Sequence, residues 1–264
     1  MQRDLHLKRP ALPVRGLLAS PHRGAVEVAA LFGLYGFYQL IRGFGELDFE
    51  AAQRNTEAIV AAEQRLQVFV ERGVQDWALG VPGLAALLGF AYLALHLVLT
   101  PAVLVWVYRN HRERFPLVRT TLVVSTALAL VGYVVYPAAP PRLAGLGFAD
   151  TVSERAGLNL SSDVLGSFYN PIAAVPSLHF GYAMLVGGAV TWLARNRALR
   201  LAGVVYPALM LFIIVATGNH FLLDAVAGGA VVLAGWAFAR LLIPSRREPI
   251  TAGRPQRHLE RLAA

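Results

Sequence analysis

Six long apolar segments, separated by polar or basic connections, divide most of the chain. They cover roughly residues 24–43, 84–108, 117–137, 176–194, 199–217 and 219–243. Each approaches the ~20 residues that a helix needs to cross the ~30 Å hydrocarbon core of a bilayer. The pattern predicts an all-α fold, a polytopic membrane helical bundle with six transmembrane helices over residues 24–243. Basic segments at residues 1–23 and 244–264 flank this predicted membrane domain.

The stretch between the first two apolar segments follows another pattern. From Phe49 to Trp77, apolar residues such as Ile59 alternate with charged residues at the spacing of a helix with two unlike faces. Such a helix lies on a surface instead of crossing a membrane. We therefore predict one long amphipathic extracytoplasmic helix at about residues 50–77. Packing against the bundle is the favoured interpretation, and direct contact with a substrate is the alternative.

The arginines give the predicted helices an orientation. They cluster between the second and third segments, between the fourth and fifth, and after the sixth, and the N-terminal segment is also basic. Residues 44–83 instead carry seven acidic residues and three arginines. Because basic loops of membrane proteins stay in the cytoplasm, we expect both termini there. This orientation places Arg142, His179, His220 and Asp224 at the extracytoplasmic face of the cell membrane.

Composition agrees with a membrane protein. Of the 264 residues, 56% are hydrophobic, and the mean hydropathy is +0.51. Water-soluble domains of this length rarely reach such values. The net charge of +8 is spread over the loops, so we expect no nucleic-acid partner. The absence of cysteine excludes a disulfide framework, a thiol nucleophile and a thiolate metal site.

Three short motifs place polar groups at the ends of predicted spans. The first, Tyr136–Arg142, reads Tyr-Pro-Ala-Ala-Pro-Pro-Arg; the second is Pro-Ser-Leu-His, ending at His179; and the third runs from His220 to Asp224. An ionisable group inside an apolar segment is costly and therefore indicates a functional site. On a helix, residues i and i+4 share a face, so we expect Asp224 to reach the imidazole of His220. Two histidines, one of them oriented by a carboxylate, can supply a nucleophile and a general acid.

In this order the three motifs resemble those of the type 2 phosphatidic acid phosphatase (PAP2) superfamily, and most closely its branch of inositol phosphorylceramide synthases. The resemblance covers roughly residues 25–243. It implies that His220 attacks phosphorus, that Asp224 orients His220, and that His179 protonates the leaving oxygen. It also implies that Arg142 and Ser177 bind the phosphate. The implied substrate is a membrane lipid or lipid phosphate, with a polar alcohol or lipid alcohol as acceptor, and neither a cofactor nor a metal is expected.

Three departures from the pattern of the simple phosphatases favour the synthase branch, which shares them. Leu178 stands where many members have glycine, no lysine precedes Arg142, and Ile213 and Ile214 replace a Ser-Arg pair before the third motif. We therefore expect transfer of a polar head group of the inositol-phosphate type. The alternative is a lipid phosphate phosphatase that acts on phosphatidate or an isoprenoid phosphate.

Other interpretations of the same residues stay open at this point. His220 and Asp224 are also a candidate structural pair, and together with His179 they are a candidate zinc site. A proton-coupled transporter would use such groups as well, although its polar residues should be distributed across the membrane depth. A non-catalytic scaffold has no chemical need for them. For His96, in the middle of the second span, we expect an interhelical hydrogen bond or a place in a polar cavity wall.

Overall fold

The regular structure of this protein is helical. A computed structural model describes residues 48–155 and 170–243, with isolated positions at 29, 33, 36 and 157. Outside the helices of that part there is one isolated bridge, between Ala138 and Ala173. The predicted all-α class is confirmed. The helices are α3 (Phe49–Arg65), α4 (Glu71–Gly80), α5 (Leu84–Ala94), the π-helix η1 (Leu95–Leu99), α6 (Thr100–Asn110), α7 (Phe115–Val135), the short 3-10 helix η2 (Pro141–Leu143), α8 (Thr151–Glu154), α10 (Leu178–Leu193), α11 (Arg197–Ala216) and α12 (Leu222–Leu242).

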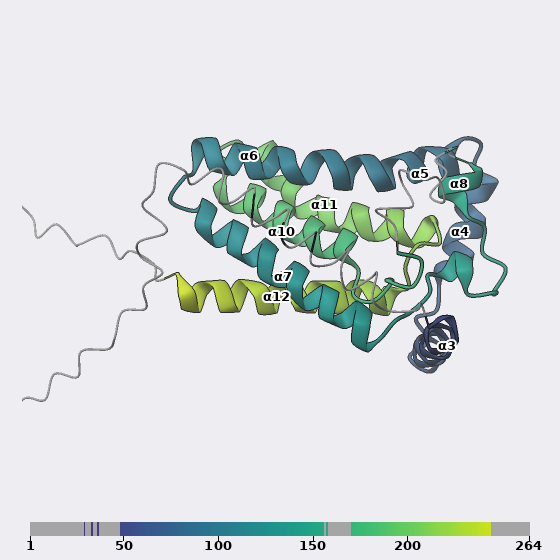
Figure 1. Cartoon of the computed structure of the whole chain (residues 1–264). Helices are drawn as coiled ribbons and strands as arrows, with labels where there is room; N and C mark the ends of the chain where they lie inside the picture. The colour runs from purple at the N-terminus through teal and green to yellow at the C-terminus, as the bar shows by residue number, and fades with distance from the viewer. Residues whose placement is uncertain are drawn as a thin grey trace, which may run out of the picture. The chain divides into compact units, whose positions relative to one another are not determined.

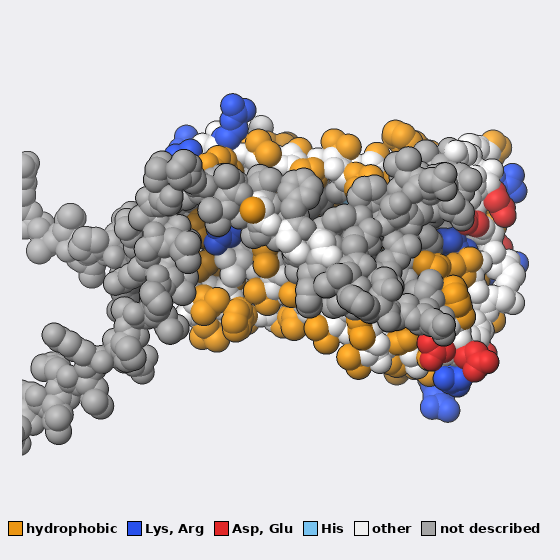
Figure 2. Space-filling view, in the orientation of Figure 1, with side chains coloured by type: hydrophobic (Ala, Val, Ile, Leu, Met, Phe, Trp, Pro, Cys, Tyr) orange, Lys and Arg blue, Asp and Glu red, His pale blue; other side chains and the backbone are white. Residues whose placement is uncertain are grey.

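Among the described residues, four helical stretches are long and apolar enough to cross a membrane. They are Leu84–Asn110, Phe115–Val135, Arg197–Ala216 and Leu222–Leu242. In Figure 1 these stretches and α10 lie side by side, with α3, α4 and α8 at one end of the bundle. Figure 2 shows apolar side chains along the flank of the bundle and charged side chains towards its two ends, as expected for a membrane protein.

The structure does not show all six of the predicted spans. The predicted span at 24–43 and the basic segments at 1–23 and 244–264 lie outside the described residues. The predicted span at 176–194 is the helix α10, whose 16 residues make it about 24 Å long, shorter than the ~30 Å hydrocarbon core. The apolar run of the sequence begins with Pro176 and Ser177, which form the turn before the helix. This helix packs against α6, α7, α11 and α12, so it lies in the middle of the bundle.

The predicted amphipathic helix at 50–77 is two helices, so that prediction was wrong in its continuity. The chain leaves α3 after Arg65 and enters α4 at Glu71. Between them Gln67 has a φ of 59°, a left-handed conformation that ends a right-handed helix. The break changes which side chains of the two helices can meet.

Small residues bring the helices close together near the start of α10. A Cβ atom on Gly228 would collide with the backbone oxygen of Ser177, and one on Gly181 would lie 3.0 Å from the backbone oxygen of Gly228. Gly228 therefore permits the close approach of the two helices. This contact fixes the start of α10 against the first turns of α12.

Candidate active site

Backbone hydrogen bonds join the three sequence motifs at one end of the bundle. The N–H of Ser177 donates to the carbonyl oxygen of Asp224 at 2.9 Å, which ties the second motif to the third. The N–H of Arg142 donates to the carbonyl oxygen of Gly218 at 3.0 Å, which ties the first motif to the turn before α12. The predicted site residues therefore come together, although they are far apart in the sequence.

His220 lies against Asp224, but not on a helix. The helix α12 begins at Leu222, so His220 belongs to the preceding turn and Asp224 to the first helical turn. One carboxylate oxygen of Asp224 lies 3.3 Å from Nδ1 of His220 and accepts the N–H of Phe221 at 2.9 Å. Both side chains are buried. The predicted contact between His220 and Asp224 is confirmed. It does not come from a shared helical face, as the sequence suggested, because the carboxylate caps the start of α12 and reaches back to the imidazole.

His179 is the second residue of α10, and aromatic rings surround it. Its ring centre lies 4.0 Å from that of Tyr92, 4.2 Å from that of His96 and 5.8 Å from that of His220. Its Nε2 atom is buried and has no hydrogen-bond partner in the part of the chain that the structure describes. Stacking therefore holds the plane of this ring, and no partner at Nε2 within the described residues fixes its proton.

His96 is part of this cluster, which the sequence did not indicate. Its Nδ1 atom is buried without a hydrogen-bond partner among the described residues, and its ring also lies parallel to Tyr182. The expected interhelical hydrogen bond is not formed at Nδ1 within the described residues. His96 belongs to the π-helix η1, and such widened turns are frequent at functional sites.

Arg142 and Ser177 border the two histidines. The guanidinium of Arg142 is buried; its Nε donates to Oδ1 of Asn219 at 2.9 Å, and its Nη1 lies 3.3 Å from a carboxylate oxygen of Asp150. Asn219 is the residue before His220, so the arginine and the nucleophile candidate are adjacent. The Ser177 hydroxyl accepts the N–H of Phe180 at 3.4 Å and caps α10.

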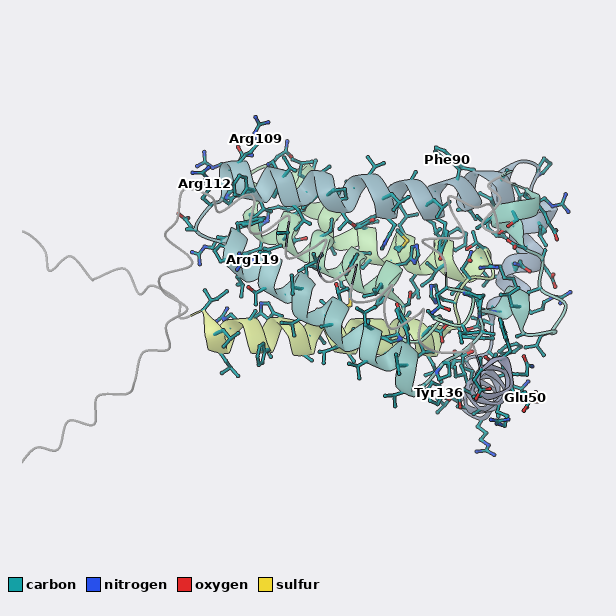
Figure 3. The ribbon with its side chains drawn as sticks, viewed as in Figure 1. Glu50, Phe90, Arg109, Arg112, Arg119 and Tyr136 are labelled. Atoms are coloured by element: carbon teal, nitrogen blue, oxygen red, sulfur yellow. The ribbon has the colours of Figure 1, made fainter. Side chains whose placement is uncertain are left out.

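The cluster and the basic loops lie at opposite ends of the bundle. Figure 3 places Arg109, Arg112 and Arg119 at one end, and Tyr136, which opens the first motif, at the other. The polar groups of the three motifs are thus gathered towards one end of the bundle, and His96 extends the cluster from there towards the middle of Leu84–Asn110. A transporter relay, which needs them at several depths, gains no support from this arrangement.

Comparison with known proteins identifies the family. A family model described as the PAP2 superfamily matches residues 57–238, which include the three motifs. The chain belongs to the PAP2 superfamily. It is a membrane enzyme of the phosphatase and phosphotransferase type.

One curated relative of this PAP2 enzyme is a phosphoinositol dihydroceramide synthase of Bacteroides thetaiotaomicron. The two proteins are 27% identical over 156 residues, which is 50% of this chain and 47% of the relative. The chain therefore spans about half the length of the curated relative that it matches. No solved structure gives a match.

Two buried carboxyl groups of the PAP2 enzyme escaped the sequence analysis. Oε1 of Glu71 accepts the N–H of Leu222 at 2.9 Å, and Oε1 of Glu63 accepts the N–H of Leu223 at 2.7 Å. Burial, together with the nearby carboxylates of Glu71 and Asp224, raises the pKa of Glu63 from 4.5 to about 8. One signal was available: Glu63 follows Ile59 by four residues and so falls on the buried face of α3.

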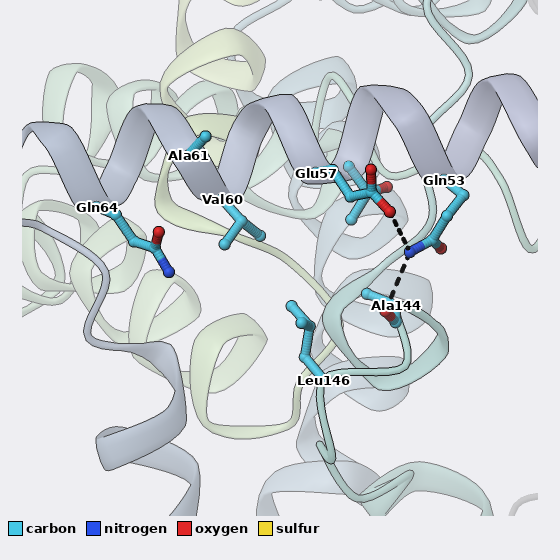
Figure 4. Close-up of a pocket in the computed structure, with 8 residues that line it drawn as sticks. Gln53, Glu57, Val60, Ala61, Gln64, Ala144 and Leu146 are labelled. Carbon is cyan, nitrogen blue, oxygen red and sulfur yellow. Dashed lines mark hydrogen bonds between the residues drawn. The ribbon is translucent and has the colours of Figure 1, made fainter.

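A separate pocket of this PAP2 enzyme lies between α3 and the loop after η2. Its volume is about 160 Å³, and none of the predicted site residues lines it (Figure 4). Its walls include Gln53, whose amide donates to Glu57 and to the carbonyl oxygen of Ala144, both at 3.3 Å.

The zinc site considered from the sequence does not form as a ligand cluster. Within residues 48–155 and 170–243, no group of three histidine, aspartate or glutamate side chains is arranged to hold a metal ion.

Proposed function

We propose that this PAP2 enzyme transfers a polar head group together with its phosphate, of the inositol-phosphate type, between a phospholipid and an alcohol acceptor. The reaction passes through a phosphohistidine. The observation that carries the proposal is the pairing of two unlike histidines at one end of the bundle. His220 is bound to a carboxylate, and His179 lies 5.8 Å away, ring centre to ring centre.

In the first step, Nε2 of His220 attacks phosphorus. Asp224 lies at Nδ1, so it favours the tautomer with the proton on Nδ1 and stabilises the positive charge that the ring gains. The N–P bond forms as the P–O bond to the lipid alcohol breaks. His179 gives its proton to that departing oxygen.

In the second step, the acceptor oxygen attacks the phosphohistidine. His179, now neutral, takes the proton of the incoming hydroxyl, and the N–P bond breaks to restore His220. Water and an alcohol enter this step through the same residues. Transfer and hydrolysis therefore differ only in the acceptor that the enzyme admits.

Arg142 and the start of α10 are the proposed phosphate-binding groups. The always-charged guanidinium lies beside the turn of His220, where it counters the charge that develops on the phosphate oxygens. Backbone N–H groups at a helix N-terminus also favour an anion, and His179 stands in the first turn of α10. Ser177, the cap of that helix, adds a hydroxyl at the same place.

The reaction is proposed to take place at the extracytoplasmic face. The arginine-rich loops lie at the other end of the bundle, and basic loops face the cytoplasm. Apolar side chains cover the flank of the bundle, as expected of an enzyme whose lipid substrate lies in the bilayer. The relative named phosphoinositol dihydroceramide synthase supports a head-group transfer of this kind.

The test is a reaction of the detergent-purified enzyme beside its His220→Ala variant. Labelled phosphatidylinositol and a labelled lipid phosphate are supplied, with and without lipid-alcohol acceptors, and products are resolved by mass. A new phosphodiester that appears only with wild type and only with an acceptor supports the proposal. Free phosphate formed without dependence on acceptor would identify a lipid phosphatase instead.

A further inference from the structure

Three carboxyl groups hold three successive N–H groups at the start of α12. Asp224 accepts from Phe221 at 2.9 Å within the helix's own first turn. Glu71 of α4 accepts from Leu222, and Glu63 of α3 accepts from Leu223. The first four N–H groups of a helix have no partner inside the helix, and negative groups there are stabilising. Two elements outside the bundle thus complete the helix that carries Asp224.

The break between α3 and α4 makes this arrangement possible. In one continuous helix, the eight residues from Glu63 to Glu71 would separate the two side chains by about 12 Å along the axis. Two carboxyl groups that far apart could not both accept from adjacent N–H groups of a single turn. The left-handed Gln67 turns the chain back, so both carboxyl groups point at the same helix end.

The two glutamates also face each other. Both are fully buried, and the Oε2 atom of each meets no other donor in the described part of the chain. Their Oε1 atoms accept from the N–H groups of the adjacent residues Leu222 and Leu223, which brings the two carboxyl groups close together. A carboxylate only accepts, so a hydrogen bond between the two side chains requires one proton held between them.

We propose that Glu63 and Glu71 share one proton and act as positioning residues for the nucleophile. The inference rests on the proposed role of His220. The pair fixes the first turn of α12, and through Asp224 it fixes the imidazole that attacks phosphorus. One shared proton leaves a single negative charge on the pair, which limits repulsion of an anionic substrate.

The pair predicts a dependence on pH. The titratable groups that face Glu63 are Glu71 from α4 and Asp224 from α12, with His220 beyond Asp224. Because the pKa of Glu63 is raised from 4.5 to about 8, the protonated pair is present at neutral pH and is lost as the pH rises through about 8. A second charge then appears beside Asp224, and we expect turnover to fall.

Paired substitutions test the positioning role. Glu63→Gln and Glu71→Gln keep an oxygen for the backbone N–H and a donor for the neighbouring carboxylate, so we expect kcat within about threefold of wild type. Glu63→Ala and Glu71→Ala lose the contact, and we expect kcat to fall by about 10- to 100-fold with little change in KM. Glu63→Gln should also lack the fall in turnover above pH 8. The control is Glu50→Ala, an exposed residue of the same helix that pairs with Arg54.

The kinetic result contradicts the proposal in two cases. Alanine variants with full activity would show that the pair positions nothing. Glutamine variants as impaired as the alanine variants would show that the neutral form of Glu63 is not the working form.

A measurement without substrate separates this inference from the proposed function. The infrared spectrum of wild type at neutral pH should contain a protonated carboxyl band that is absent in Glu63→Gln and present in Glu50→Gln. With isotope-labelled histidine, the ring signals of His220 should shift in Glu63→Ala and not in Glu63→Gln. If both results appear but no lipid is turned over, the proposed function fails and the pair stands. If the enzyme is active and the band is missing, the pair is refuted.

Discussion

His220 and His179 lie side by side in the candidate active site, yet different contacts hold them. His220 has a carboxylate at Nδ1, and that carboxylate belongs to a helix end completed by Glu63 and Glu71. His179 has ring faces around it, from Tyr92 and His96, and no hydrogen-bond partner at Nε2 among the residues described. One histidine is held by charge and hydrogen bonds, and the other by stacking.

The difference between the contacts of the two histidines matches their proposed roles as nucleophile and general acid. A nucleophilic imidazole must keep one tautomer and carry a positive charge while phosphorus is bound, and a fixed carboxylate serves both needs. A general acid must give up its proton and take another within one cycle. Stacking fixes the plane of His179 without binding that proton. The surroundings of each ring therefore suit the step assigned to it.

The largest expected effect is that of His220→Ala. Without the nucleophile no phosphohistidine forms, and we expect turnover to fall by about 10⁴-fold or more. The loss should be equally severe for lipid substrates and for an aryl phosphate, whose leaving group needs no proton. The variant should elute and melt like wild type. Full activity of purified His220→Ala would remove the assignment.

His179→Ala should show a smaller loss that depends on the leaving group. We expect a fall of about 10²- to 10⁴-fold for a lipid alkoxide, because the proton donor is lost. With an aryl phosphate, most of the rate of phosphoenzyme formation should return. Equal losses on both substrates would mean that the two histidines do not have separate roles.

Much of the nucleophile's side of the site could be predicted from the sequence. The pair of His220 and Asp224 depends on a spacing of four residues at the start of an apolar segment, and such local patterns persist in the fold. Even here the sequence favoured a helix through both residues, whereas the helix begins at Leu222. Gly218 turns the chain with a φ of 67° just before, and a capping carboxylate reaches back across that turn.

The supporting residues could not be predicted in the same way. The chain between Leu66 and Val70 contains neither glycine nor proline, so nothing marked the break that brings Glu63 and Glu71 together. The depth of His96 in its span was clear, but its contact with His179 depends on how two distant helices pack. Tertiary packing decides such contacts, and periodicity along one helix does not contain that information.

A smaller effect is expected at His96, and it sharpens the contrast between stacking and hydrogen bonding. His96→Phe keeps a ring against His179, so we expect kcat within about threefold of wild type. His96→Ala removes one stacking face, and we expect a fall of about tenfold for lipid substrates. The aryl phosphate should be less affected, because His96 acts through the general acid. A severe loss in His96→Phe would instead assign the imidazole itself a role in proton transfer.

The smallest expected effect is that of a chelator. A loss of activity in its presence would contradict the different roles assigned to His220 and His179. If a metal ion bridged the site, His179 and His220 would be equivalent ligands, and their different surroundings would have no chemical meaning. The proposed phosphohistidine route uses only side chains, so dialysis against EDTA should leave kcat unchanged. Activity that is lost in EDTA and restored by zinc would replace the nucleophile and acid with a metal-activated water. Unchanged activity, together with the leaving-group dependence of His179→Ala, leaves the two histidines with the unlike roles that their contacts indicate.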